Sequence, residues 1–118
     1  MIAEVDFSNA FNSVERSAIA KEVAEHFPIL NTWFALIYGK PTNLIVRNQP
    51  AIKSERGVQQ GDPLGPFLFA LALQPALKMA AESGACVLAY LDDVYVCGRR
   101  ENVISVIEAL IEETQKIR

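Results

Sequence analysis

The stretch CVLAYLDDVYVC, residues 86–97, decides the fold of this chain. Strand-forming residues lie on both sides of Asp92 and Asp93, and this pattern predicts an antiparallel β-hairpin with the two aspartates as its turn residues. Because side chains alternate between the two faces of a strand, one face of the hairpin packs against helices and the other is open to a ligand. The inner face then holds Val87, Ala89, Leu91, Val94 and Val96, and the outer face holds Cys86, Leu88, Tyr90, Tyr95 and Cys97.

The two aspartates suggest a cation site as well as a turn. Adjacent carboxylates between apolar strands repel each other unless solvent or a cation neutralises them. Asp is a good turn residue, so a plain turn is one interpretation. Tight two-residue hairpins, however, favour Asn-Gly or Asp-Gly, whereas Mg²⁺ prefers carboxylate oxygens. Asp92 and Asp93 are therefore candidate ligands of a divalent cation.

The segments before and after this hairpin carry alternating strand and helix patterns. Apolar spacing, Pro and Gly punctuation and strand-forming residues set their bounds. We expect a strand over residues 1–7, helices over 14–27 and 30–38, short strands over 44–47 and 50–53 with a turn at 48–49, a helix from 62 to 83 with a kink at Pro75, and a last helix over 103–117. This order predicts an α+β fold, a two-layer sandwich with helices packed on one face of an antiparallel sheet.

Composition limits the class of protein. The chain has 118 residues, of which 51% are apolar and 21% charged, so one folded domain is expected and disorder is excluded. The net charge of −3 argues against a nucleic-acid binder that works alone. The acidic start and the lack of a long apolar run favour an intracellular protein, nuclear or cytoplasmic. Cys86 and Cys97 become diagonal neighbours in the predicted register, so we expect two reduced thiols.

Asp6 is a third candidate ligand. It ends the first predicted strand, and in an antiparallel sheet such an end can lie beside a neighbouring hairpin turn. Three carboxylates in one place would suit a two-metal site for in-line phosphoryl transfer. Taken alone, an aspartate at a strand end is more often a helix or turn cap.

The segment GVQQGDPLGP, residues 57–66, is the third distinctive stretch. Its three glycines and two prolines fix a backbone path and allow a ligand to approach the chain closely. Asp62 and Pro63 are typical of a helix start, where Asp caps free N–H groups. A rigid junction between loop and helix is the alternative.

Together, DFSNAFN (6–12), QGDPLGP (60–66) and YLDD (90–93) resemble motifs A, B and C of the reverse transcriptase palm, in the right order. The residues of these motifs most resemble those of enzymes from non-LTR retrotransposons, and the resemblance covers nearly the whole chain. It implies a polymerase palm with a ferredoxin-like core. It also implies an RNA-directed DNA polymerase that adds deoxynucleotides to a primer 3′-hydroxyl by two-metal phosphoryl transfer.

The resemblance also implies roles for single residues. Asp6, Asp92 and Asp93 would be catalytic: Asp6 and Asp92 would bind both Mg²⁺ ions, or Mn²⁺, Asp93 would help more variably, and the Phe7 carbonyl would be a possible further ligand. Phe11 would lie under the incoming sugar, where its volume excludes a 2′-hydroxyl. The remaining expected contacts are the N–H groups of Asn9, Ala10 and Phe11 with the triphosphate, Gln60 and Gly61 with the nucleotide and template base, Tyr90 with the primer terminus, and Lys53 and Arg56 with nucleic acid.

The sequence departs from this family by what it lacks. No fingers, motif D, primer grip, thumb, endonuclease or RNase H segment is present, so we expect residues 1–118 to be a palm fragment of a larger polymerase, inactive alone. The missing parts would supply the basic channel for the RNA template and DNA primer. Three alternatives stay open: another palm-fold nucleotidyl transferase such as a cyclase, a degenerate element copy, and a ferredoxin-like RNA-binding module. The last would need stacking aromatics and basic residues on the open sheet face.

Overall fold

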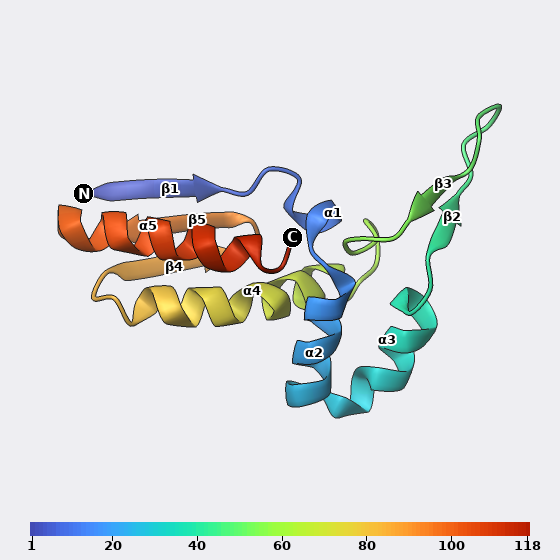
Figure 1. Cartoon of the computed structure of the whole chain (residues 1–118), viewed down its shortest axis with the longest axis horizontal. Coiled ribbons are helices and arrows are strands. Elements are labelled where there is room, and N and C mark those ends of the chain that lie inside the picture. Colours follow the sequence, from blue (N-terminus) through green and yellow to red (C-terminus); the bar gives the residue numbers. More distant parts are fainter.

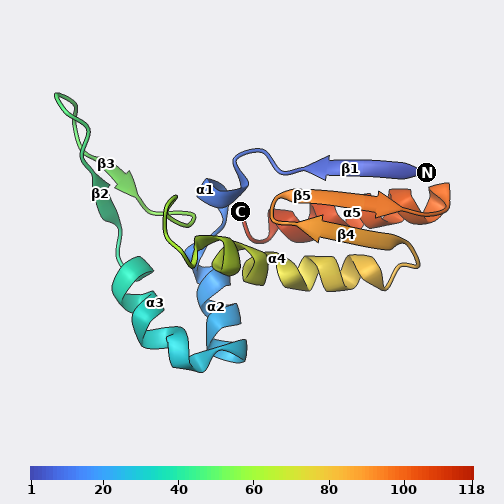
Figure 2. The same ribbon diagram turned by 180° about the vertical axis from the view of Figure 1, so that it is seen from behind.

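A three-stranded antiparallel sheet with two helices on one face forms the larger lobe of the molecule. The structure is a computed structural model that describes residues 1–118. The strands lie in the order β1 (Ile2–Asp6), β5 (Asp93–Cys97), β4 (Cys86–Tyr90). Figure 1 shows α5 (Arg100–Gln115) in front of this sheet and α4 (Gly65–Ala81) running below β4, and Figure 2 shows the opposite, uncovered face. The predicted α+β sandwich is therefore confirmed.

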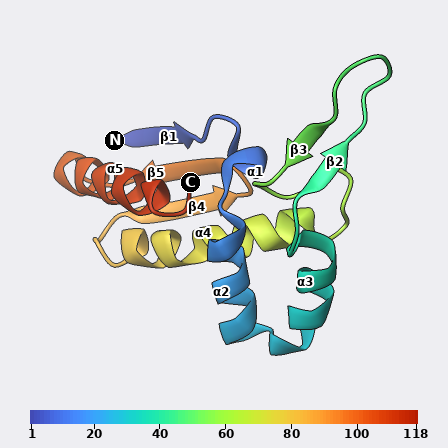
Figure 3. The same cartoon turned by 45° about the vertical axis from the view of Figure 1, so that its right-hand side comes forward.

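The smaller lobe holds the segments between β1 and α4. They are α1 (Ala10–Ser13), α2 (Arg16–His26), a 3₁₀ turn η1 (Pro28–Leu30), α3 (Asn31–Tyr38), β2 (Thr42–Leu44) and β3 (Ile52–Ser54). The β2–β3 hairpin projects from the helices of this lobe and away from the sheet (Figure 3). The radius of gyration is 16.0 Å, against about 13.5 Å for a compact domain of this length. The difference reflects this projecting arm.

The hairpin of β4 and β5 differs from the sequence prediction by one residue. Its turn residues are Leu91 and Asp92, and Tyr90 pairs with Asp93. In this register Asp93 pairs with Tyr90 of β4 on one side and with Asp6 of β1 on the other. Each of the two ladders of β5 therefore has one more pair than it would if Asp93 lay in the turn. Moving the turn by one residue shifts the pairing by two positions, so residues of the two strands keep their predicted faces. Leu91, predicted on the inner face, instead lies in the turn, and Ala89 of that face is exposed.

The shifted register changes the relation of the two cysteines. Cys86 and Cys97 lie directly opposite one another, so the prediction of diagonal neighbours was wrong. Both are free thiols, as expected.

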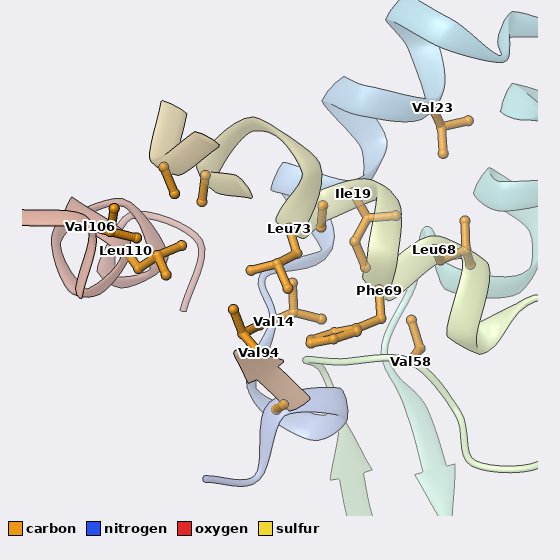
Figure 4. Packing of buried hydrophobic residues seen from close by; sticks show 14 of the residues in the cluster. Val14, Ile19, Val23, Val58, Leu68, Phe69, Leu73, Val94, Val106 and Leu110 are labelled. Carbon is orange, nitrogen blue, oxygen red and sulfur yellow. The ribbon is translucent and has the colours of Figure 1, made fainter. Parts of the chain in front are cut away.

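The core lies between the sheet and α5 and continues along α4 to α2. Figure 4 shows Phe69 and Leu73 of α4 between Val94 of the sheet and Ile19 of α2. Because α4 packs against α2, α5 and β4, apolar side chains are buried on more than one of its sides. This explains its nearly unbroken apolar sequence. No helix of the chain is both long and apolar enough to cross a bilayer.

Several further element bounds differ from expectation. β2 begins earlier than the predicted 44–47, and β3 begins later than the predicted 50–53. Pro50 lies outside β3 because it has no N–H for the ladder. α4 begins at Gly65, not at Asp62. The Asp62 side chain instead closes a tight turn before the helix by accepting a hydrogen bond from the Leu64 N–H at 2.9 Å.

Candidate active site

Asp6 and Asp93 face one another at one end of the sheet. They are cross-strand partners, the last pair of the β1–β5 ladder. Met1 and Gly98 exchange both of their backbone hydrogen bonds, and bonded and non-bonded pairs alternate along an antiparallel ladder. Asp6 and Asp93 are therefore a non-hydrogen-bonded pair, the kind with Cα atoms about 4.5 Å apart and the closest side chains.

No cation neutralises this pair within the chain. Both aspartates are exposed on the uncovered sheet face, and none of the salt bridges involves Asp6, Asp92 or Asp93. Like charges directly opposite one another are unfavourable in a sheet. Asp92 adds a third, half-buried carboxyl-bearing residue in the adjoining turn. The structure thus pairs Asp6 with Asp93 across the sheet, but the ligand atoms of all three aspartates do not lie within 4.8 Å of one another.

The turn that carries Asp92 is strained. Leu91 has φ +56°, in the left-handed region that residues with a Cβ rarely adopt. Tyr90 pairs with Asp93 and is 76% exposed on the same face, which suits contact with a ligand above the carboxylates. Phe7 follows Asp6 directly, and its carbonyl accepts no backbone hydrogen bond. That oxygen is free to act as a further ligand.

The backbone after Phe7 turns sharply into α1. Asn9 adopts φ +55° and precedes the helix. The N–H groups of Asn9, Ala10 and Phe11 donate no hydrogen bond within the chain. Such unpaired donors at the start of a helical turn suit an anionic ligand.

Phe11 joins the segment after β1 to the loop before α4. Its ring stacks on that of Phe69, with centroids 4.6 Å apart. Its carbonyl accepts a 2.8 Å hydrogen bond from the Val58 N–H, and the Gly57 N–H donates to Val14 at 2.8 Å. A Cβ on Gly57 would lie 2.4 Å from the Phe11 carbonyl oxygen, so only glycine allows this approach.

Gln60 and Gly61 are exposed at the tip of that loop. Gln60 borders two open hollows of about 560 and 630 Å³. One lies toward the β2–β3 hairpin and the other toward Trp33 of α3. The loop therefore has ligand-sized space on both of its sides.

Of the predicted nucleic-acid contacts, Arg56 lines one of these hollows, whereas Lys53 and Tyr90 line neither. Lys53 on β3 is exposed and forms no ion pair, whereas Arg56 pairs with Glu15 at 3.0 Å. Residues 40–56 include four of the eleven basic residues and one of the fourteen acids, so this segment carries +3 and the rest of the chain −6. The projecting hairpin is thus a basic arm on an acidic body.

Sequence reasoning missed one set of residues at this site. Arg16, Tyr38 and Asp62 form a network around the loop of residues 57–62. A signal was present for Arg16, because it lies three and seven residues before Ile19 and Val23, on the same buried stripe of α2. A charged residue on such a stripe needs internal partners.

A second carboxylate cluster lies outside this site. Glu22, Glu25 and His26 on α2 offer ligand atoms within 4.8 Å of one another. His26 lies 3.3 Å from Glu22 as an ordinary i, i+4 pair.

Comparisons with known proteins agree with the geometry. The family described as reverse transcriptase (RNA-dependent DNA polymerase) matches residues 1–117. The Retrotransposable element SLACS 132 kDa protein of Trypanosoma brucei gambiense is 29% identical over 124 residues, which cover 98% of this chain and 10% of that protein. The chain thus spans about a tenth of the length of the relative that it matches.

Proposed function

Since this chain belongs to the reverse transcriptase family, we propose that residues 1–118 are the palm of an RNA-directed DNA polymerase of non-LTR type. The observation that carries the proposal is the facing pair of Asp6 and Asp93 with Asp92 in the next turn. The match to a tenth of a retrotransposable element protein supports a larger polypeptide around this palm.

The carboxylates fit a pair of divalent cations. Asp6, Asp92 and Asp93 would hold them, with the Phe7 carbonyl, which accepts no backbone hydrogen bond, as a further ligand. The direct pairing of Asp6 with Asp93 supports this assignment. Mg²⁺ suits oxygen ligands of this kind, and Mn²⁺ would serve as an alternative. When bound, these ions would activate the primer 3′-hydroxyl and stabilise the pyrophosphate leaving group.

Other residues would position the substrates. The free N–H groups at residues 9–11 would bind the triphosphate, and Gln60 and Gly61 would lie against the nucleotide and template base. Phe11 would exclude a ribose 2′-hydroxyl by volume, and its stack on buried Phe69 supports a fixed ring position.

The duplex would approach the uncovered sheet face at Tyr90, and the basic arm would contact nucleic acid through Lys53. The ion pair with Glu15 makes Arg56 the weaker candidate of the two. The uncovered face has Glu4, Asp6 and Asp93 but no lysine or arginine. This composition disfavours a module that binds RNA through its sheet alone. It also supports the expectation that residues 1–118 extend no primer by themselves, because the duplex needs basic contacts from elsewhere.

The test is RNA-templated primer extension by the longest natural polypeptide that contains this chain. With Mg²⁺ and deoxynucleotides, Asp6→Asn and Asp93→Asn should each lower kcat by at least about 100-fold, as expected when transition-state charge loses stabilisation. Ser83→Ala, which removes a hydroxyl at the far end of α4, is the matched control. An inactive wild-type protein would favour a degenerate element copy, and active Asp6 and Asp93 variants would refute the metal site.

The role of Phe11 has a separate test in the same protein. Phe11→Val should raise the kcat/KM for a ribonucleotide relative to that for the matched deoxynucleotide. If Phe11 were only a packing residue, both values would fall together. An unchanged ratio would therefore remove the sugar-selection role.

A further inference from the structure

Arg16 is a buried charge without a counter-ion. Its side chain is on the inner stripe of α2, the residue is only 9% exposed, and it forms no salt bridge. Burying a charge is costly unless every donor is satisfied. A guanidinium in this position therefore depends on neutral acceptors, which must be held close to it.

All the acceptors of Arg16 lie in the short segment before the exposed loop. Nε donates to the Gly57 carbonyl at 3.0 Å, and the two terminal nitrogens donate to the carbonyl and hydroxyl of Ser54, each at 3.0 Å, and to the Arg56 carbonyl at 3.3 Å. The fixed fork of the guanidinium matches these acceptors. Arg16 thus anchors the chain where it enters the loop.

Tyr38 anchors the loop farther along. Its hydroxyl donates a short hydrogen bond to the Asp62 carboxylate and accepts one from the Gln59 N–H at 3.2 Å. Its ring lies under the Arg16 guanidinium, 5.2 Å from ring centroid to Cζ. The residue is only 3% exposed. The two anchors are therefore in contact and form one unit.

These contacts bracket the two residues that face the hollows. Gly57 and Gln59 are held on one side, and Asp62 on the other, whereas Gln60 and Gly61 form no hydrogen bond within the chain. When both ends of a loop are held by hydrogen bonds, its central residues lose little conformational entropy on binding a ligand, and their polar groups remain available to that ligand.

We propose that Arg16 and Tyr38 are positioning residues that hold Gln60 and Gly61 in place for the incoming deoxynucleotide. The role in catalysis rests on the proposed polymerase function, but the anchoring itself does not. Tyr38→Phe is the sharpest perturbation, because the ring and its contact with Arg16 remain while both hydroxyl hydrogen bonds are lost.

The first measurement is amide hydrogen exchange on residues 1–118. In Tyr38→Phe, the Gln59 and Leu64 amides, which depend on Tyr38 and on Asp62, should exchange at least about tenfold faster. Amides of β5 and of the middle of α4 should keep their rates, and Ser83→Ala should change neither set. Unchanged rates at Gln59, or equal acceleration throughout the chain, would overturn the proposal.

The second measurement is steady-state kinetics in the longer polypeptide. Tyr38→Phe should raise the KM for deoxynucleotide about tenfold, while kcat and the KM for primer–template stay within about twofold. Arg16→Lys, which keeps the charge but not the fork, should change the same constant in the same direction. Loss of kcat alone would contradict a positioning role. If the wild type extends no primer, the polymerase proposal fails, and hydrogen exchange still decides whether the loop is anchored.

Discussion

Replacing Asp6 by asparagine should make the chain more stable. Asp6 and Asp93 face one another as a non-hydrogen-bonded pair without a cation. Two like charges about 5 Å apart in water repel by about 0.8 kcal/mol, and like charges directly opposite one another destabilise a sheet. Asparagine keeps the size of the side chain and removes the repulsion. We therefore expect a gain of about 0.5–1 kcal/mol in the free energy of unfolding.

Urea unfolding of both proteins at two salt concentrations measures this gain. Raising the ionic strength from about 0.01 M to about 1 M shortens the screening length from about 30 Å to about 3 Å, so the difference should shrink by more than half. Mg²⁺ should stabilise the wild type more than Asp6→Asn, because only the wild type keeps both facing carboxylates. Glu55→Gln, an exposed change of the same charge, is the control. An Asp6→Asn protein less stable than wild type at low salt would refute the reasoning.

Three further outcomes follow from the geometry. Gly57→Ala should lower the free energy of unfolding by more than about 2 kcal/mol, because its Cβ would meet the Phe11 carbonyl at 2.4 Å. At Gly61 no atom lies within 4 Å of a Cβ, so Gly61→Ala should lower it by only about 1 kcal/mol, through left-handed backbone strain. Urea unfolding of the two variants compares these losses. Because Cys86 and Cys97 lie directly opposite one another, a mild thiol oxidant should join them in a disulfide within one molecule, and two titratable thiols should be lost. If the two cysteines were diagonal neighbours, both thiols would stay reactive. Burial, followed by the hydrogen bond to Asp62, raises the pKa of Tyr38 to about 12. Because the folded chain holds this proton more tightly, the stability that it contributes should be lost as pH rises from about 10 through 12. In a pH titration followed by near-ultraviolet tyrosinate absorbance, Tyr38→Phe should lack the step at the highest pH.

The sequence predicted the fold class and the inner and outer faces of the β4–β5 hairpin. It did not determine the turn, because placing the turn at 91–92 or at 92–93 keeps the other strand residues on the same faces and changes only the positions of Leu91 and Asp93. The observed register pairs Tyr90 with Asp93 and so places Leu91 and Asp92 in the turn. The pairing of Cys86 directly opposite Cys97 was missed for the same reason.

The anchors of the exposed loop depend on contacts that no local pattern shows. Tyr38 precedes Asp62 by 24 residues, and Arg16 precedes Gly57 by 41. Asp62 in a Gln-Gly-Asp-Pro segment is typical of a helix cap, and its carboxylate does accept a backbone hydrogen bond. Its second partner, the Tyr38 hydroxyl, is set by how α3 packs beside the loop, which the tertiary structure decides.

The central claim is that Asp6, Asp92 and Asp93 together hold the divalent cations for DNA synthesis. Its most direct test is the loss of backbone amide NMR signals on adding substoichiometric Mn²⁺ to residues 1–118. We predict that signals from Asp6 and from residues 90–93 disappear first and return when excess Mg²⁺ competes. Loss confined to the surroundings of His26, where Glu22 and Glu25 form the other carboxylate cluster, would contradict the claim.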